Sequence, residues 1–335
     1  MTAPEGPRAA GREGVRLREE LDRTILGDQP RLDADQVADA AGMSPKEARR
    51  LWRALGFPDP GEEPAFTEAD VEALTRVVRG SGAGLDADTV VRMTRAVGST
   101  MSRLADWEVG NLLAAFEEGN PGPHTPEDRL RAGIRLVGVI TPSFEALLLY
   151  AWRRHLAAAV ARVEALGAAD VDLHTTQVTV GFADLVQFTA LSNQMDQGRL
   201  GDLVEVFESR CQDVVATHHG RVIKTLGDSV LFVSEDAVRA LDMAFGIVEV
   251  IGRDNRLPDV RVGLATGSVV MRLGDVFGPP VNMAARLTSV ARRNRVITDP
   301  ATVALLPPTR FEARPLPPRP LRGFGIVEPV AVRRT

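Results

Sequence analysis

The sequence predicts an α+β protein in which an all-helical half precedes a ferredoxin-like βαββαβ domain. Three observations support this. From about Val15 to Leu166, apolar residues recur at the three- and four-residue spacings of helices. From Val178, β-branched runs and amphipathic stretches follow the order strand, helix, strand, strand, helix, strand. A short polar connector lies between them. We therefore expect a disordered leader at 1–14, a helical domain at 15–166, a linker at 167–176 and a second domain at 177–335.

The first-half elements are predicted from their end signals. Ser44 followed by Pro45 is typical of a helix start, with the serine as N-cap, so two short helices are expected within 33–57. A helix is expected after Phe66-Thr67. The pair Thr141-Pro142 predicts the start of a last helix, which Gly167 ends. Runs of Gly and Pro predict loops at 58–64, 80–84 and 120–126.

The second-half elements follow from alternating patterns bounded by turn residues. Gly227-Asp228 is a tight-turn signal that joins two strands. The expected strands are 178–185, 221–226, 229–233, 260–266 and 268–273, and the expected helices are 191–218 and 236–252.

Composition excludes several classes of protein. The 335 residues are 44% hydrophobic and 25% charged, as in globular proteins. The single cysteine, Cys211, excludes an intrachain disulfide and favours a reducing, cytoplasmic location. No run of 18 apolar residues occurs, so we expect no membrane span. The N-terminus has no apolar segment typical of a signal peptide.

The net charge of −5 is unevenly distributed. Residues 1–174 carry 21 Lys+Arg against 28 Asp+Glu, whereas the remaining residues carry 19 against 17. An acidic first half argues against nucleic-acid binding, which needs positive charge. The second half is the better host for a polyanionic small molecule. Only two lysines occur, and one of them, Lys224, lies in an apolar predicted strand.

Two carboxylates predict a metal site. Asp184 ends an apolar strand, and Asp228 occupies the tip of a predicted hairpin. Their strands are neighbours in a ferredoxin-like sheet. Two carboxylates with nearby backbone carbonyls suit two ions of Mg²⁺ or Mn²⁺. The alternatives are a helix N-cap for Asp184 and an ordinary turn residue for Asp228.

A third segment, Gly274 to Leu287, contains a helix that begins at Pro279-Pro280. Asn282 and Arg286 are four residues apart and therefore project from one face of that helix. A neutral donor and a guanidinium on one face suit a phosphoryl transition state. The alternative is a surface helix with a solvated arginine.

These three segments resemble the class III nucleotidyl cyclases over about 177–333. The resemblance implies that Asp184 and Asp228 bind the metal ions. It implies that Lys224 and Asp275 read the adenine edge, whereas a guanine reader would carry a carboxylate at position 224 and a small residue such as Cys at 275.

The same resemblance implies that Asn282 and Arg286 stabilise the transition state. The reaction would be attack of the ATP ribose 3′ oxygen on the α-phosphorus, which gives 3′,5′-cyclic AMP and pyrophosphate. In this family the two sets of residues come from different subunits, so a homodimer is implied. Arg322 lies where many members have a phosphate-binding lysine; its alternative is a solvated loop arginine.

The first half resembles the helical regulatory domain of the autoinhibited cyclase branch, some members of which respond to pH. The segment from Val37 to Pro58 carries this match. His155 and His174 flank the end of the last predicted helix and are candidate pH sensors.

Two other interpretations of the first half remain open. The segment also resembles a helix-turn-helix of the MerR kind, with a basic second helix, which would make a DNA-binding regulator with a degenerate cyclase-like domain. The basic residues are Lys46, Arg49, Arg50 and Arg53. The very apolar stretch from Ile134 to Leu149 predicts core, with a pocket for a fatty-acid-like ligand as a further hypothesis.

Overall fold

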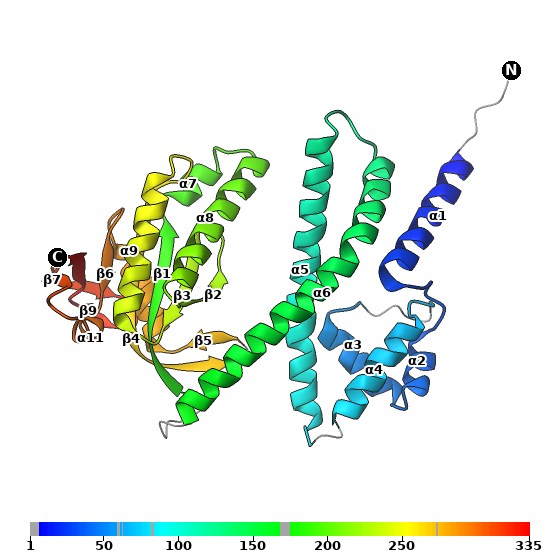
Figure 1. Cartoon of the computed structure of the whole chain (residues 1–335), viewed down its shortest axis with the longest axis horizontal. Helices are drawn as coiled ribbons and strands as arrows, with labels where there is room; N and C mark the ends of the chain where they lie inside the picture. Colours follow the sequence, from blue (N-terminus) through cyan, green and yellow to red (C-terminus); the bar gives the residue numbers. More distant parts are fainter. Residues whose placement is uncertain (1–6, 59–60, 62, 82–83, 168–174, 273) are drawn as a thin grey trace. The chain divides into compact units, whose positions relative to one another are not determined.

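The computed structural model describes the chain except residues 1–6, 59–60, 62, 82–83, 168–174 and 273 (Figure 1). The chain divides into two compact units, Met1–Ala158 and Ala159–Thr335. The first is helical and the second contains the sheets. The boundary between the units lies within a helix, before the change of pattern that the sequence shows at about residue 177.

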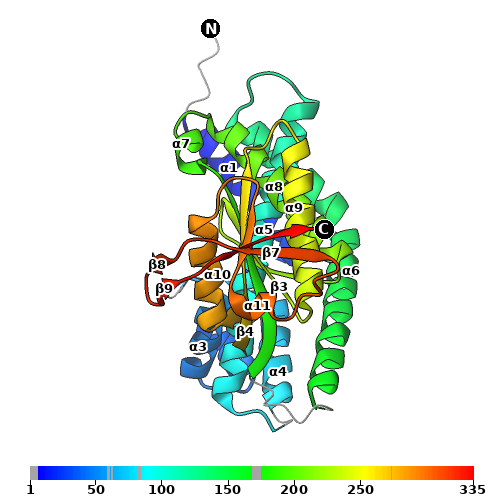
Figure 2. The ribbon, with the colours of Figure 1, turned by 90° about the vertical axis from the view of Figure 1, so that its left-hand side faces the viewer.

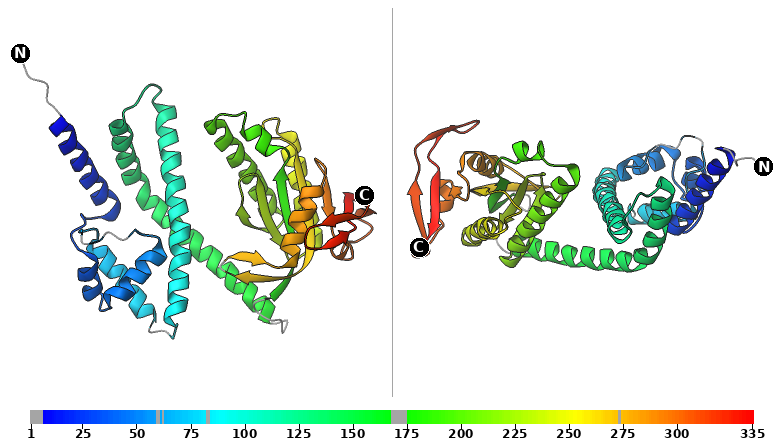
Figure 3. Two further views of the ribbon diagram at one scale, coloured as in Figure 1. Left: turned by 180° about the vertical axis from the view of Figure 1, so that it is seen from behind. Right: turned by 90° about the horizontal axis from the view of Figure 1, so that it is seen from above.

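The described residues of the helical unit form six helices. They are α1 (Pro7–Leu26), α2 (Ala34–Ala40), α3 (Pro45–Leu55), α4 (Glu68–Ser81), α5 (Ala87–Gly119) and α6 (Pro126–Gly167), which continues into the second unit. Ser44 caps α3 in a reciprocal capping box with Glu47, as its sequence predicts. Buried Val37, Leu51 and Trp52 hold α2 and α3 in one apolar cluster. The two longest helices are α5, with 33 residues, and α6, with 42 (Figure 3).

Two expectations for this unit are wrong. Helix α1 begins at Pro7, so residues 7–14 are helical where a disordered leader is expected. Helix α6 begins at Pro126 and contains Pro142 in its interior, where a helix start is expected. Thr141 does not cap, because its hydroxyl donates back to the carbonyl of Val137 at 2.7 Å, a contact made inside a helix.

The apolar stretch from Ile134 to Leu149 does not form the core that its composition predicts. Ile134 is buried, but Val139 is 79% exposed and Leu147 is 55% exposed. Among the described residues, one helix segment, Pro126–Glu164, is long and apolar enough to cross a membrane by length and composition alone, with a mean hydropathy of 1.5 and 11% of its window buried. One such helix is weak evidence for a membrane span.

The second unit has the predicted ferredoxin-like topology. Its first four strands lie in the order β2-β3-β1-β4, and all their pairings are antiparallel. The elements are β1 (Thr175–Leu185), α7 (Phe188–Ser192), α8 (Gln197–Thr217), β2 (Arg221–Thr225), β3 (Ser229–Ser234), α9 (Ala237–Arg253), β4 (Val260–Arg272), β5 (Asp275–Phe277), α10 (Pro279–Val290), β6 (Val296–Thr298), α11 (Pro300–Val303), β7 (Phe311–Pro315), β8 (Arg319–Leu321), β9 (Gly325–Val327) and β10 (Val330–Arg334).

Two boundaries in this unit differ from expectation. The helix predicted over 191–218 is interrupted, because Asp196 starts a new helix by capping α8. The two strands predicted over 260–273 form the single strand β4, since Gly267 stays in register opposite Val178 of β1. A glycine in a strand does not end it when the neighbouring strand continues the ladder.

Helices cover both faces of the sheet (Figure 2). Helices α8 and α9 pack on one face around Phe207 and Ile247, and α10 packs on the other face around Leu287. Alternation along β1 places Ala183 and Leu185 on the α8/α9 side and Val180 and Phe182 on the α10 side. Asp184 therefore lies on the side of the sheet that α10 covers.

Candidate active site

The structure brings the two predicted metal aspartates together. Asp184 of β1 lies opposite Ser229 of β3, the residue that follows Asp228. The backbone N–H of Leu185 donates to the carbonyl of Asp228 at 2.9 Å. The turn between β2 and β3 is closed by Leu226 N–H donating to Ser229 at 2.7 Å, with Gly227 at φ 70°. Antiparallel pairing therefore joins two carboxylates that are far apart in the sequence.

Asp184 is held by two side chains from neighbouring strands. The Ser229 hydroxyl donates to Oδ1 at 2.6 Å, and Arg261 Nε of β4 donates to Oδ2 at 2.8 Å. Arg261 also donates to the carbonyl of Ser289 in α10 at 3.1 Å. The Asp184 side chain is 16% exposed, so this ion pair is shielded from water. The carboxylate is thus oriented before any ligand arrives.

Sequence reasoning missed Arg261. Its only signal is a lone arginine in the apolar run Val260 to Ala265. A charged residue in such a run indicates a polar partner on the same face of the sheet. Naming that partner as Asp184 requires the register between β1 and β4, which places the two residues opposite each other.

The charged form of the Asp228 carboxylate is disfavoured by its surroundings. Burial raises the pKa of Asp228, and the nearby charge of Asp184 raises it further, while Arg261 partly offsets both. Two carboxylates near each other repel when both are ionised. A cation at this place relieves the repulsion, which is the electrostatic environment of a metal site.

The donor set fits Mg²⁺ or Mn²⁺. Within the described ranges, no group of three or more His, Cys, Asp or Glu side chains could hold an ion. Two carboxylates with a nearby backbone carbonyl form an incomplete oxygen shell. Mg²⁺ is commonly held in this way, by one or two carboxylates with water and substrate phosphates in the remaining positions. The site therefore fits ions that arrive with a polyphosphate.

The structure also brings Lys224 and Asp275 together. Lys224 Nζ of β2 lies 2.5 Å from Asp275 Oδ2 of β5. The other carboxylate oxygen of Asp275 accepts the N–H of Val276 at 2.8 Å, which fixes its orientation. The side chains are 39% and 27% exposed, so a ligand can reach both. The pair offers one donor and one acceptor side by side.

Asn282 and Arg286 lie on the exposed face of α10, as their spacing predicts. Ala284 and Leu287 on the opposite face are buried against the sheet. Arg322 is exposed in the turn between β8 and β9. In the described part of the chain, the side chains of these three polar residues form no hydrogen bond or ion pair, and no hydrogen bond links them to Asp184 or Asp228. One chain does not by itself assemble all the predicted residues in contact.

Of the two histidines predicted to sense pH, the structure describes one. His155 is exposed on α6. His174 lies outside the described residues.

Comparisons with known proteins cover both halves of the chain. Residues 172–331 match the adenylate and guanylate cyclase catalytic domain family. The chain is 39% identical to an adenylate cyclase from Streptomyces coelicolor, over 97% of this chain and 91% of that protein. It is 37% identical to an adenylate cyclase from Streptomyces griseus, over 94% and 88% of the two proteins.

A third relative is the pH-sensitive adenylate cyclase MT1302 from Mycobacterium tuberculosis. The identity is 33%, over 82% of this chain and 70% of that protein. All three similarities extend beyond the catalytic domain into the helical half. With the four-stranded topology, the aspartate pair and the Lys224–Asp275 pair in place, the chain belongs to the adenylate cyclases of the class III nucleotidyl cyclase family.

Proposed function

We propose that the chain converts ATP to 3′,5′-cyclic AMP and pyrophosphate at sites shared by two copies of the chain. The observation that carries this proposal is the pairing of two preorganised groups in one domain. Asp184 is held by Ser229 and Arg261, and Lys224 is held by Asp275. The first group suits metal-bound phosphates and the second suits a purine edge.

Asp184 and Asp228 would hold two divalent ions, Mg²⁺ or Mn²⁺. When bound, such ions lower the pKa of a hydroxyl and neutralise charge on a phosphoryl group. The chain's own task is positioning. Ser229 and Arg261 keep Asp184 in one orientation, so little reorganisation is needed when the nucleotide binds. Arg261 adds a positive charge beside the place where the phosphates would lie.

Lys224 and Asp275 would select adenine. The ammonium of Lys224 donates to adenine N1, and the carboxylate of Asp275 accepts from the N6 amine. Guanine presents a donor at N1 and an acceptor at O6, so the same pair would face donor against donor and acceptor against acceptor. Unpaired polar groups in a partly buried site are costly, and this cost supplies the discrimination.

The remaining groups would act across a homodimer interface. Asn282 and Arg286 are exposed and have no partner of their own within the described residues. Arg286 would stabilise charge on the transferring phosphoryl group, and Arg322 would contact the leaving phosphates. Large apolar side chains near the site are also exposed, including Leu226 at 51% and Phe277 at 51%. A second copy would bury them and would supply the missing residues.

The helical unit would regulate this activity, with pH or a lipid as the signal. A hollow of about 400 Å³ lies between α5 and α6 and is lined mainly by apolar side chains. It includes Leu136 and Ile140 from the apolar stretch noted in the sequence, with Arg135 at its edge. A fatty-acid-like ligand would place its chain there and its carboxylate near that arginine. The lone, buried Cys211 is consistent with a cytoplasmic enzyme.

The rival function, a DNA-binding regulator, is disfavoured by charge pairing on α3. Arg49 pairs with Asp35 at 2.8 Å, and Arg50 pairs with Asp88 at 2.5 Å. Arginines already neutralised by carboxylates are poorly placed to displace counterions from DNA. Leu51 and Trp52 of the same helix are buried in the core of the unit. The helix-turn-helix therefore has the features of a packing scaffold.

The decisive experiment incubates the purified chain with ATP or GTP, each with Mg²⁺ or Mn²⁺. Cyclic products are separated and quantified. We expect cyclic AMP, little cyclic GMP and no product when the metal is chelated. Cyclic GMP as the main product would contradict the adenine-reading roles. No cyclic product under any condition, from a folded dimer, would contradict the proposed activity.

A further inference from the structure

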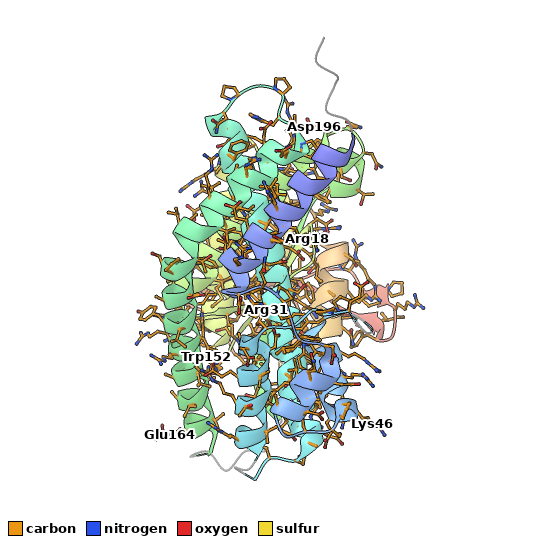
Figure 4. All side chains as sticks on the ribbon, turned by 90° about the vertical axis from the view of Figure 1, so that its right-hand side faces the viewer. Arg18, Arg31, Lys46, Trp152, Glu164 and Asp196 are labelled. Atoms are coloured by element: carbon orange, nitrogen blue, oxygen red, sulfur yellow. The ribbon has the colours of Figure 1, made fainter. Side chains whose placement is uncertain are left out.

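A hollow of about 460 Å³ lies beside the last turns of α6, and the residues that line it belong to the second unit. Glu164 marks this end of α6 (Figure 4). The lining comes mainly from α6, the starts of β1 and β2, and the ends of β3 and β4. Val178 in its wall lies six residues before Asp184 on β1, which is about 20 Å along a strand. We call this feature the α6–sheet hollow. Its size is typical of small-molecule sites, and it is separate from the candidate active site.

Two arginines without counter-charges line the α6–sheet hollow. Arg162 comes from α6 and Arg221 from β2, and both side chains are partly buried. In the part of the chain that the structure describes, neither guanidinium forms an ion pair, and Arg221 makes only a weak contact with the sulfur of Met271 at 3.8 Å. Burial lowers the pKa of Arg221, and the nearby charge of Arg162 lowers it further. Because two like charges in a partly buried place repel each other, an anion between them would be stabilising.

The carboxylates of the α6–sheet hollow leave a positive charge in excess. Asp236 caps α9, and its Oδ2 lies 3.9 Å from Nε of Arg239, the third arginine of the lining. Glu235 is exposed, and its charge only partly offsets the lowering of the Arg221 pKa. Three arginines against two carboxylates leave one unmatched positive charge. His219, the remaining titratable group of the lining, can only add to it.

The rest of the lining is largely apolar and indicates the body of the ligand. The apolar side chains come from four elements: Ala159 and Val163 of α6, Val178 of β1, Val233 of β3 and Met271 of β4. A few convergent charged groups in an apolar wall are typical of a site for a ligand with an apolar body and one charged group. The paired N–H groups of a guanidinium match the two oxygens of a carboxylate.

We propose that the α6–sheet hollow binds a small organic carboxylate, with its anionic group between Arg162 and Arg221 and its apolar body against Val178 and Val233. A carboxylate adds one negative charge, which matches the single charge in excess. The ligand would bridge α6 and β2, the strand that carries Lys224. It would therefore hold the end of the helix that leads into the catalytic domain. Binding needs neither nucleotide nor metal ion, so it can be tested independently of the proposed function.

Titration calorimetry of the full chain with 2-naphthoate tests the proposal. This probe has one carboxylate on a compact apolar ring system, and 2-naphthamide is its neutral counterpart of the same shape. We expect one 2-naphthoate site per chain with a Kd of ~0.1–1 mM. The amide should bind at least ~10-fold more weakly, because it lacks the charge that pairs with the arginines. Equal binding of acid and amide, or no binding of the acid, would overturn the proposal.

Substitutions locate the carboxylate within the chain. Arg162→Gln and Arg221→Gln are each expected to weaken 2-naphthoate binding at least ~10-fold. Glu235→Gln should strengthen binding, because it removes a competing negative charge. The matched control is Arg135→Gln, which replaces another arginine of α6, beside the hollow between α5 and α6, and should change the affinity less than ~2-fold. Unchanged affinity in both Arg162→Gln and Arg221→Gln would contradict the assignment.

Two other binding places predict different patterns, and each would overturn the proposal. Loss of binding in Arg135→Gln, with binding retained in Arg162→Gln, would place the probe between α5 and α6. Loss of binding in Lys224→Glu, with binding retained in Arg162→Gln, would place it at the candidate active site.

Thermal unfolding provides a second readout that separates loss of binding from loss of fold. With 2-naphthoate at ~10 times its Kd, the melting temperature of the parent chain should rise by roughly 2–5 °C. Arg162→Gln should show no such rise. Without the probe, Arg162→Gln should melt no lower than the parent, because it removes a charge that repels Arg221. An equal rise in the parent and in Arg162→Gln would overturn the proposal.

Discussion

The guanidinium of Arg261 is bound to the carboxylate of Asp184, with Nε 2.8 Å from Oδ2. This contact gives the two active-site aspartates different environments. Asp184 has a cation and a hydroxyl as partners, whereas Asp228 has a raised pKa because it is partly buried and lies near Asp184. The two aspartates are therefore expected to contribute differently to the stability of the metal-free protein, although the proposed function needs both.

Replacing each aspartate by asparagine should separate these roles. Both Asp184→Asn and Asp228→Asn are expected to lose at least ~100-fold in activity, since each removes a charged metal ligand. In the presence of a chelator, Asp184→Asn should lower the melting temperature because it leaves Arg261 without its counter-charge. Asp228→Asn should raise it by roughly 1–3 °C, because it removes a partly buried charge that the charge of Asp184 repels.

The stabilisation by Asp228→Asn should depend on pH in a defined direction. The folded-state pKa of Asp228 is raised, so its charge destabilises the fold fully at pH above that pKa, and this cost disappears only as the pH falls to the pKa of the unfolded chain. The gain in melting temperature is expected near pH ~7.5 and should shrink as the pH falls towards ~4. Calorimetry of both chains across this range checks the sign. A gain that grows on acidification would contradict the electrostatic account of Asp228.

Changing the base-reading pair should change nucleotide preference. Lys224→Glu combined with Asp275→Cys is expected to lower kcat/KM for ATP at least ~10-fold, because the hydrogen bonds to the adenine edge are lost. A gain with GTP is allowed but not required, since the pocket walls also matter. Steady-state rates with both nucleotides provide the measurement. The ATP preference should be unchanged in the control Lys46→Glu, which replaces the other lysine of the chain, exposed on α3.

Mixed dimers should reveal shared active sites. Asp184→Asn chains and Arg286→Ala chains are each expected to be inactive alone. After subunit exchange, one of the two sites in a heterodimer contains neither substitution, so about a quarter of the parental activity should return when half the dimers are mixed. Mixing Asp184→Asn with Asp228→Asn is the matched control. Because both substitutions fall in the same half-site, that mixture should stay inactive.

Removing the helical unit should test control by pH. A chain that begins near Asp172 is expected to be more active than the full chain at neutral pH, because an inhibiting domain is absent. The full chain should gain activity as the pH falls towards ~6, the range in which a free histidine side chain gains a proton. The shortened chain should not gain. Rates at saturating ATP and metal ion provide the comparison.

Two outcomes would change this account of regulation. Parallel pH profiles for the two chains would show that the helical unit senses something other than protons. A less active shortened chain would show that the unit supports dimerisation instead of inhibiting the enzyme.

The sequence by itself determined the order of the catalytic elements and the candidate site residues. Strand alternation, the Gly227-Asp228 turn and the spacing of Asn282 and Arg286 are local patterns, because backbone geometry fixes them within a few residues. The structure places the two predicted side-chain pairs together: Asp184 lies beside the strand turn that carries Asp228, and Lys224 contacts Asp275. Residue type and spacing pointed to these positions, and the resemblance to the cyclase family implied their roles.

Only the tertiary structure decided the partners and the exposures. Arg261 meets Asp184 across 77 positions of sequence through the register of β1 and β4, which no local pattern specifies. Helix α6 runs through Pro142 because Thr141 bonds back into the helix instead of capping it. The apolar stretch that composition assigns to the core is largely exposed, since burial depends on which surfaces meet and not on hydrophobicity alone.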